Sequence, residues 1–66
     1  MTLTQLQFAK AVADARSFVG AARACHVSQP SLSNAVAKLE DELGGPLFAR
    51  TTRHVDLTPF GASLMP

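Results

Sequence analysis

Apolar residues recur at helical spacing along most of the chain, and at alternating spacing in one short segment near its end. The clearest helical run is the segment 29–43, where four apolar residues fall at i, i+4, i+7 and i+11: Leu32, Val36, Leu39 and Leu43. This spacing puts all four on one narrow stripe. Ser28 can cap the first turn, and Pro30 fits a position where the helix needs no N–H. The pattern predicts an amphipathic helix with one buried face.

Two shorter helices are expected before it, at about 4–15 and about 18–25. In the first, which we interpret as scaffolding, one side is expected to carry Leu3, Leu6, Ala9, Val12 and Ala13, with Phe8 at its border. In the second, Ser17 is a suitable N-cap, and an i, i+3, i+4, i+7 face is formed by Phe18, Ala21, Ala22 and Cys25. The paired alanines allow two helices to cross closely.

The outward face of the segment 29–43 is unusual for a solvated helix, which would carry Glu and Lys pairs there. Opposite its apolar stripe and at its N-terminal tip, this segment carries Gln29, Pro30, Ser31, Ser33, Asn34, Ala37 and Lys38. Small polar groups near the positive end of a helix suit close approach to an anion. A tight turn, His26 to Ser28, joins this helix to the one before it. Two helices connected in this way, the second with a polar outer face, describe a helix-turn-helix.

The long helix is expected to end at Gly44 in a left-handed conformation, and Pro46 prevents its resumption. An acidic cluster, Glu40 to Glu42, lies at its negative end, where it is unfavourable for the helix dipole. The cluster either keeps that end away from phosphates or is merely a solvated acidic end.

Beyond Pro46 the apolar period changes from helical to alternating. Phe48 and Arg50, then Val55 and Leu57, alternate around a polar tip made of Thr51, Thr52, Arg53 and His54. This is typical of a short β-hairpin, or wing. An arginine at such a tip is either solvated or reaches a phosphate or the minor groove. A last helix is expected to begin with Thr58 as N-cap and Pro59 at its first position, with an apolar face started by Phe60, Leu64 and Met65.

The fold class predicted is therefore mainly α: a winged helix-turn-helix with a three-helix core, a β-hairpin wing and the start of a further helix. We expect one core made of Val12, Phe18, Ala22, Leu32, Val36 and Leu39, extended under the wing by Leu43, Phe48 and Leu57. The 66 residues suffice for one small domain.

Composition excludes some classes and leaves others open. The net charge of +1 is not by itself a nucleic-acid signature. The single cysteine, Cys25, cannot form an internal disulfide and fits a reducing cytoplasm; we interpret it as a small core side chain, with a redox or metal role as the alternative. No apolar run approaches the length of a membrane span. His26 and His54 have no partner at ligand or triad spacing, so neither an enzyme nor a cofactor site is expected in this chain.

Nearly the whole chain resembles the N-terminal winged helix-turn-helix domain of LysR-type transcriptional regulators. The residues that carry the resemblance are Phe18 with Ala21-Ala22; His26-Val27-Ser28-Gln29-Pro30-Ser31-Leu32-Ser33; Leu39-Glu40-Asp41-Glu42-Leu43-Gly44; Pro46-Leu47-Phe48; Arg50-Thr51; Arg53; and Leu57-Thr58 with Gly61. The resemblance implies a DNA-binding domain at 1–57 and the truncated start of a linker (dimerisation) helix at 58–66, with the effector domain absent.

Such regulators are bacterial proteins that bind an interrupted inverted repeat in double-stranded DNA near a promoter. The resemblance implies dimerisation through the helix beginning at Thr58, and a small-molecule co-inducer bound only by the absent effector domain. By position, the recognition helix at about 29–43 would place Gln29, Pro30 and Ser33 at base edges in the major groove. Backbone or minor-groove contacts would come from Ser28, Ser31 and Lys38 and, on the wing at 50–55, from Arg50, Thr51 and Arg53.

The chain departs from the family pattern at several positions. Ala35 and Ala37 lie where the family usually has polar or basic residues nearby, so the recognition helix carries less charge than usual. Asn34 stands where the family usually has a basic residue, and its amide could instead pair with an adenine edge. Gly45 replaces a usual Val and is expected to loosen the lead-in to the wing, and Pro59 replaces a usual Glu. The alternative to DNA binding is a helix-turn-helix used as a protein-interaction module, which a gel shift against random duplex DNA at low salt would distinguish.

Overall fold

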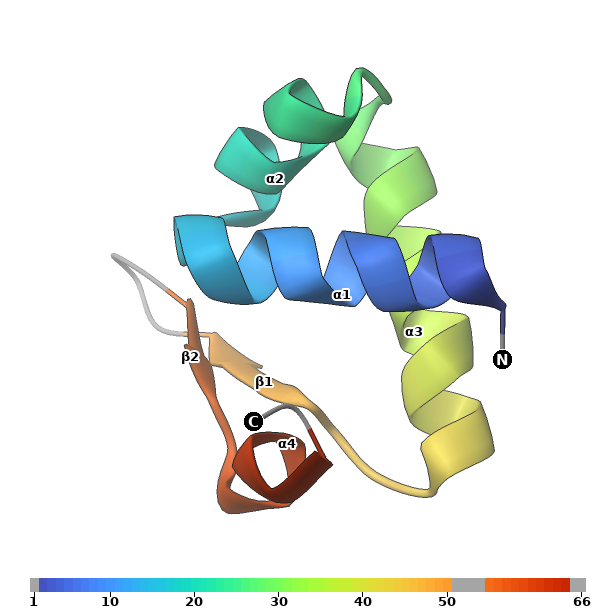
Figure 1. Ribbon diagram of the computed structural model, residues 1–66, viewed down its shortest axis with the longest axis vertical. Coiled ribbons are helices and arrows are strands. Elements are labelled where there is room, and N and C mark those ends of the chain that lie inside the picture. Colours follow the sequence, from blue (N-terminus) through green and yellow to red (C-terminus); the bar gives the residue numbers. More distant parts are fainter. Residues whose placement is uncertain (1, 51–54, 65–66) are drawn as a thin grey trace.

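The computed structural model describes residues 2–50 and 55–64, and within them the elements follow one another in the predicted order. The helices are α1 (Leu3–Ala15), α2 (Phe18–Cys25), α3 (Gln29–Leu43) and α4 (Pro59–Leu64), and the strands are β1 (Phe48–Arg50) and β2 (Val55–Leu57). Figure 1 shows α1 crossing α3, with α2 on one side of α1 and the hairpin and α4 on the other. The predicted mainly α winged arrangement is confirmed.

The helix boundaries follow from local capping chemistry. Thr2 caps α1, because its Oγ1 accepts a hydrogen bond from the Gln5 N–H at 3.1 Å while the Gln5 Oε1 accepts one from the Thr2 N–H at 3.2 Å. Ser17 caps α2 as predicted, with its Oγ accepting from the Gly20 N–H at 3.0 Å. Arg16 and His26 end α1 and α2 in the left-handed conformation, with φ of 54° and 58°. The connections between the helices are therefore short.

The predicted apolar side of α1 is wrong in its N-terminal half. Leu3 is 71% exposed and Leu6 is 41% exposed, whereas Ala9 and Val12 are fully buried. Leu3 and Val12 are nine residues apart, which at 3.6 residues per turn is two and a half turns, so they point to opposite sides. The true buried stripe is centred on Ala9 and Val12, with Phe8 half-buried at its edge.

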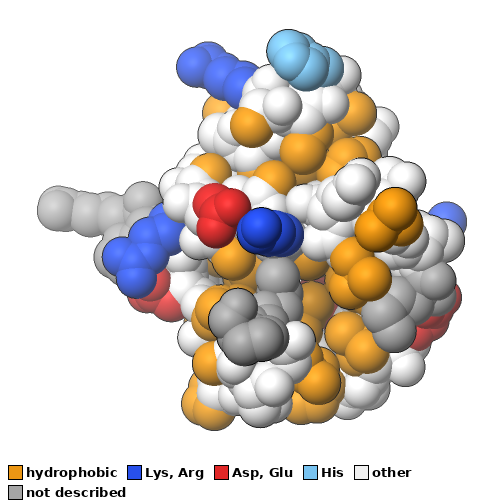
Figure 2. Space-filling model, in the orientation of Figure 1, with side chains coloured by type: hydrophobic (Ala, Val, Ile, Leu, Met, Phe, Trp, Pro, Cys, Tyr) orange, Lys and Arg blue, Asp and Glu red, His pale blue; other side chains and the backbone are white. Residues whose placement is uncertain are grey.

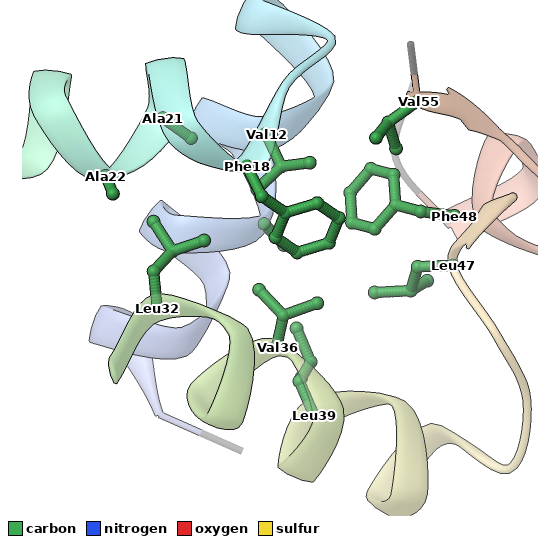
Figure 3. Packing of buried hydrophobic residues seen from close by; sticks show 11 residues of the cluster. Val12, Phe18, Ala21, Ala22, Leu32, Val36, Leu39, Leu47, Phe48 and Val55 are labelled. Carbon is green, nitrogen blue, oxygen red and sulfur yellow. The ribbon is translucent and has the colours of Figure 1, made fainter. Parts of the chain in front are cut away.

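The core lies where α1, α2 and α3 meet, and it continues under the hairpin (Figure 3). All six residues predicted for its centre are buried, and the predicted extension is confirmed, with Phe48 buried and Leu43 and Leu57 partly buried against the core. Phe18 of α2 meets Phe48 of β1 edge to face, with ring centroids 6.0 Å apart. Leu47, which is 1% exposed, was not among the predicted core residues. It adds one of the largest buried side chains at the start of the wing.

The wing is the predicted antiparallel hairpin, with Phe48 opposite Leu57 and Arg50 opposite Val55. The predicted polar tip, residues 51–54, lies outside the described residues. The wing is attached to the corner between α1 and α2 at the first residue of β2, because the Val55 N–H donates to the Arg16 carbonyl at 3.2 Å. An exposed ion pair between Arg16 and Asp56, at 3.6 Å, adds little to this attachment.

The joint between the wing and α4 depends on Thr58. Its Oγ1 accepts from the Gly61 N–H at 2.9 Å, as expected of an N-cap, and donates to the Pro46 carbonyl at 2.6 Å. The Thr58 N–H donates to the Leu47 carbonyl at 3.0 Å. Gly61 is packed so tightly there that a Cβ atom would collide with the Leu47 carbonyl. These contacts fix the direction in which α4 leaves the domain.

Candidate nucleic-acid interface

The first turn of α3 is positioned by α2. The Val27 N–H in the connecting turn donates to the Ala22 carbonyl at 3.0 Å, and the Val27 side chain packs against the core. Ala21 and Ala22 are buried between the helices, so α2 approaches α3 closely. In Figure 1 the first turn of α3 lies beside α2, at the end of the molecule away from α4.

The tip of α3 is organised by its own serines. Ser28 caps the helix as predicted, since its Oγ accepts from the Ser31 N–H at 3.3 Å and also donates to the Ser31 Oγ at 2.8 Å. Pro30 has no N–H to offer. Hydroxyls and amides of side chains therefore make up most of the polar surface of the tip, rather than a row of free backbone N–H groups.

A second contact joins the two turns of the tip. The Gln29 Nε2 donates a hydrogen bond to the Ser33 Oγ at 2.8 Å, and both side chains are half-buried. Residues four apart lie on the same face of a helix, so this pairing needs no distortion. The family resemblance implies base edges for both residues but no contact between them, although their i, i+4 spacing carries that signal.

The predicted outward face is confirmed as solvent-accessible. The exposed residues are Ser28, Pro30, Ser31, Asn34, Ala37 and Lys38, and the half-buried ones are Gln29 and Ser33. The structure thus brings the six predicted residues between 28 and 34 together at the tip, with Lys38 one turn further along. The remaining predicted residues are on the wing: the Arg50 side chain, Thr51 and Arg53 lie outside the described part of the structure, and only the Arg50 backbone is placed, in β1.

Charge differs between the two ends of α3. At the tip end, Arg23 is exposed in the last turn of α2, and Figure 2 shows a basic side chain and a histidine together at this end of the molecule. At the other end are the three acidic residues. One of them has a role that the sequence did not reveal, because the Glu40 Oε2 accepts a hydrogen bond from the Leu47 N–H at 2.7 Å. Glu40 is therefore neither merely solvated nor solely repulsive: it ties the end of α3 to the start of the wing.

A hollow of about 430 Å³ lies at this acidic end, lined by Ala37, Glu40, Asp41, Gly44, Gly45 and Pro46. Its charged lining residues are both carboxylates, which disfavour a phosphate or another anion. Within the described residues, no three His, Cys, Asp or Glu side chains are grouped so as to hold a metal ion. The polar tip is thus the better candidate for binding an anionic polymer.

A short helix, a tight turn and a second helix with a polar, accessible first turn, followed by a hairpin, define a winged helix-turn-helix. The family model described as "Bacterial regulatory helix-turn-helix protein, lysR family" matches residues 3–62. The chain belongs to this family, and its fold is that of a LysR-type helix-turn-helix DNA-binding domain.

Relatives of known role agree with this assignment. The chain is 48% identical over 65 residues to the DNA-binding transcriptional dual regulator OxyR of Escherichia coli, covering 98% of this chain and 21% of that protein. The crystal structure of the CbnR DNA-binding domain in complex with DNA superposes with a TM-score of 0.93 at 37% identity, covering 98% of this chain and 75% of that one. The complex of the BenM DNA-binding domain with its benA site superposes with a TM-score of 0.91 at 39% identity, covering 97% and 72%.

The chain spans about a fifth of the length of OxyR and of the other first curated relatives it matches. In residues 2–50 and 55–64, every helix is too short or too polar to cross a membrane.

Proposed function

We propose that this chain binds double-stranded DNA in a sequence-specific manner, with α3 in the major groove and the wing on the backbone or in the minor groove. The observation that supports this most strongly is the tip of α3: an accessible turn of hydroxyls and amides, held on a rigid helix by α2. The major groove, about 12 Å wide, admits a helix of this kind. The acidic end of α3 would point away from the phosphates.

Residue roles in this proposal follow the geometry of the tip. Base edges would be contacted by the amides of Gln29 and Asn34, which pair with adenine, and approached by Pro30 and Ser33. Phosphates or the minor groove would be contacted by Ser28, Ser31 and Lys38 and, from the wing, by Arg50, Thr51 and Arg53. Solved complexes of CbnR and BenM DNA-binding domains with DNA support the choice of partner.

Assembly is part of the same proposal. Phe60 and Leu64 of α4 are 36% and 47% exposed, which is a large apolar surface for so short a helix. We infer that, in a full-length bacterial regulator in the cytoplasm, α4 continues into a self-association helix, so that two domains bind an inverted-repeat operator. A small-molecule co-inducer would bind a separate effector domain. Sedimentation of the full-length protein should show the Leu64→Asp variant shifted towards monomer; unchanged assembly would contradict the role of α4.

The test of DNA binding is a titration of two labelled duplexes with the chain. One duplex is recovered from a randomised library by selection on the chain, and the other is a scramble of the same composition. We expect tighter binding to the selected duplex, and weaker binding to both as salt rises, because phosphate contacts release counterions. Absence of binding to both duplexes at low salt would contradict the proposal and favour a protein-interaction module.

A further inference from the structure

The hydrogen bond between Gln29 and Ser33 bears on which base the tip of α3 can recognise. The two side chains are joined by an N–H donated from Gln29 Nε2 to Ser33 Oγ at 2.8 Å, across one turn of the helix. Both are only half-buried, so their remaining polar atoms stay accessible to a ligand. Both partners of the bond belong to α3, so forming it requires no other molecule.

The hydrogen-bonding capacity of the amide shows what this bond leaves available. A glutamine side chain has two N–H donors on Nε2 and one carbonyl oxygen. Once Ser33 takes one N–H, a single donor and a single acceptor remain. In the major groove, adenine presents one acceptor, N7, and one donor, the N6 amino group, whereas guanine presents two acceptors, N7 and O6. The amide held by Ser33 therefore matches adenine and can no longer donate to both acceptors of guanine.

We propose that Ser33 is a positioning residue that makes Gln29 selective for adenine over guanine; this inference rests on the proposed function. The Ser33 hydroxyl occupies the second amide donor and fixes the orientation of the amide plane. A side chain held by such a bond loses less rotamer freedom when it meets the base. The other serine pair of the tip, Ser28 and Ser31, holds the capped backbone turn instead and has no contact with the Gln29 amide among the hydrogen bonds of the described residues.

The base pair read by Gln29 is first identified as the one at which Gln29→Ala no longer discriminates between bases. The experiment then compares the selected duplex with a second duplex that carries guanine in place of adenine at that base pair and is otherwise identical. The wild-type chain should prefer adenine there by roughly 5- to 150-fold, the range of a good bidentate pair. Ser33→Ala should lower that ratio several-fold, with relatively better binding to guanine. Ser33→Thr retains the hydroxyl and should retain the preference. Ser31→Ala, which also removes a hydroxyl from the tip, should weaken binding to both duplexes alike and leave the ratio unchanged.

The double variant identifies the route by which Ser33 acts. If Ser33 works through Gln29, adding Ser33→Ala to Gln29→Ala should change the ratio no further. Additive losses, or a loss of discrimination at a different base pair in Ser33→Ala, would show that Ser33 reads a base directly and would overturn the inference while DNA binding stood. A Gln29→Ala variant with full discrimination at every base pair would overturn it as well.

A measurement without DNA separates this inference from the proposed function. In ¹⁵N-edited NMR spectra of the free chain, one of the two Nε2 protons of Gln29 should shift in Ser33→Ala and keep its position in Ser33→Thr. Identical signals in all three proteins would mean that the hydrogen bond is not formed in solution, and the inference would fail. Failure to bind any duplex would contradict the proposed function and this inference together.

Discussion

The two ends of α3 differ in almost every physical respect. At the N-terminal end, hydroxyls bond to one another and to the Gln29 amide within the first two turns, and the outward residues Pro30, Ser31 and Asn34 are exposed. At the C-terminal end, Gly44 adopts φ 90° and Glu40 reaches seven residues along the chain to the Leu47 N–H. The first end is built from contacts close in sequence, and the second from contacts with other elements.

This difference separates two roles within one helix: in the proposed function its tip reads DNA bases, while its other end joins the helix to the rest of the domain. Because the bonds at the tip are local, its surface stays accessible to a ligand. Its side chains can therefore be substituted to suit a different DNA sequence without disturbing the core. Long-range bonds at the other end couple α3 to the wing and, through Thr58, to α4. Substitutions at the two ends should therefore have separable effects: on base preference at the tip, and on stability at the joint.

The largest effect on stability is expected from Leu47→Ala. Leu47 is 1% exposed and belongs to the hydrophobic core, so its removal leaves a cavity costing about 2–5 kcal/mol. Such a loss would unfold much of a domain this small. Chemical denaturation followed by circular dichroism measures the free energy of unfolding. Leu3→Ala is the matched control: Leu3 is 71% exposed, so its variant should be within about 0.5 kcal/mol of wild type. Equal stability of the two variants would mean that the core has been misplaced.

A smaller loss should follow Glu40→Ala, which leaves the Leu47 N–H without its acceptor. A partly buried hydrogen bond to a charged group contributes about 1.5–3 kcal/mol. The neighbouring Asp41→Ala removes the same charge from an exposed side chain and serves as the control. If both variants lose the same free energy of unfolding, the loss comes from removing a charge at the helix end and not from the bond to Leu47.

Much of the fold could be predicted from the sequence because its signals are local. Ser17, Ser28 and Thr58 are caps whose partners lie three residues away, and the stripe of α3 repeats at helical spacing. The face of α1 was wrong because a series at i, i+3, i+6 and i+9 turns around the helix instead of following one side. Hydrophobicity alone could not reveal this error, since Leu3 is as hydrophobic as any core residue.

The missed parts depend on contacts that no local pattern encodes. The bond from Leu47 to Glu40 and the burial of Leu47 both require α3, β1 and α4 to be in place. At the site, the residues between 28 and 34 were found from the caps and the outward face, together with the family resemblance. Their mutual bonds were not, because the choice of rotamer at Gln29 is decided in three dimensions.

The smallest effect on stability is expected at Gly45, and it has the opposite sign. Among the described glycines, positive φ is confined to Gly44, so Gly45 can become alanine without backbone strain. A Cβ there would meet the Phe60 ring at 3.4 Å, an ordinary contact. Gly45→Ala should therefore stabilise the domain by about 0.4–1 kcal/mol, chiefly by restricting the unfolded chain. Gly61→Ala is the contrasting control and should destabilise the domain. A loss of stability in Gly45→Ala would contradict the expectation that Gly45 loosens the lead-in to the wing.

The central claim is that the tip of α3 reads bases while the wing holds the backbone. It is tested most directly by measuring Gln29→Ala and Arg53→Ala on the selected and scrambled duplexes at two salt concentrations. Gln29→Ala should lose about 1–3 kcal/mol on the selected duplex and almost nothing on the scrambled one. Arg53→Ala should weaken binding to both duplexes alike. It should also reduce the slope of the logarithm of the binding constant against the logarithm of the salt concentration by about one per subunit. Equal weakening of both duplexes by Gln29→Ala would mean that the tip only holds the backbone, and would contradict the account.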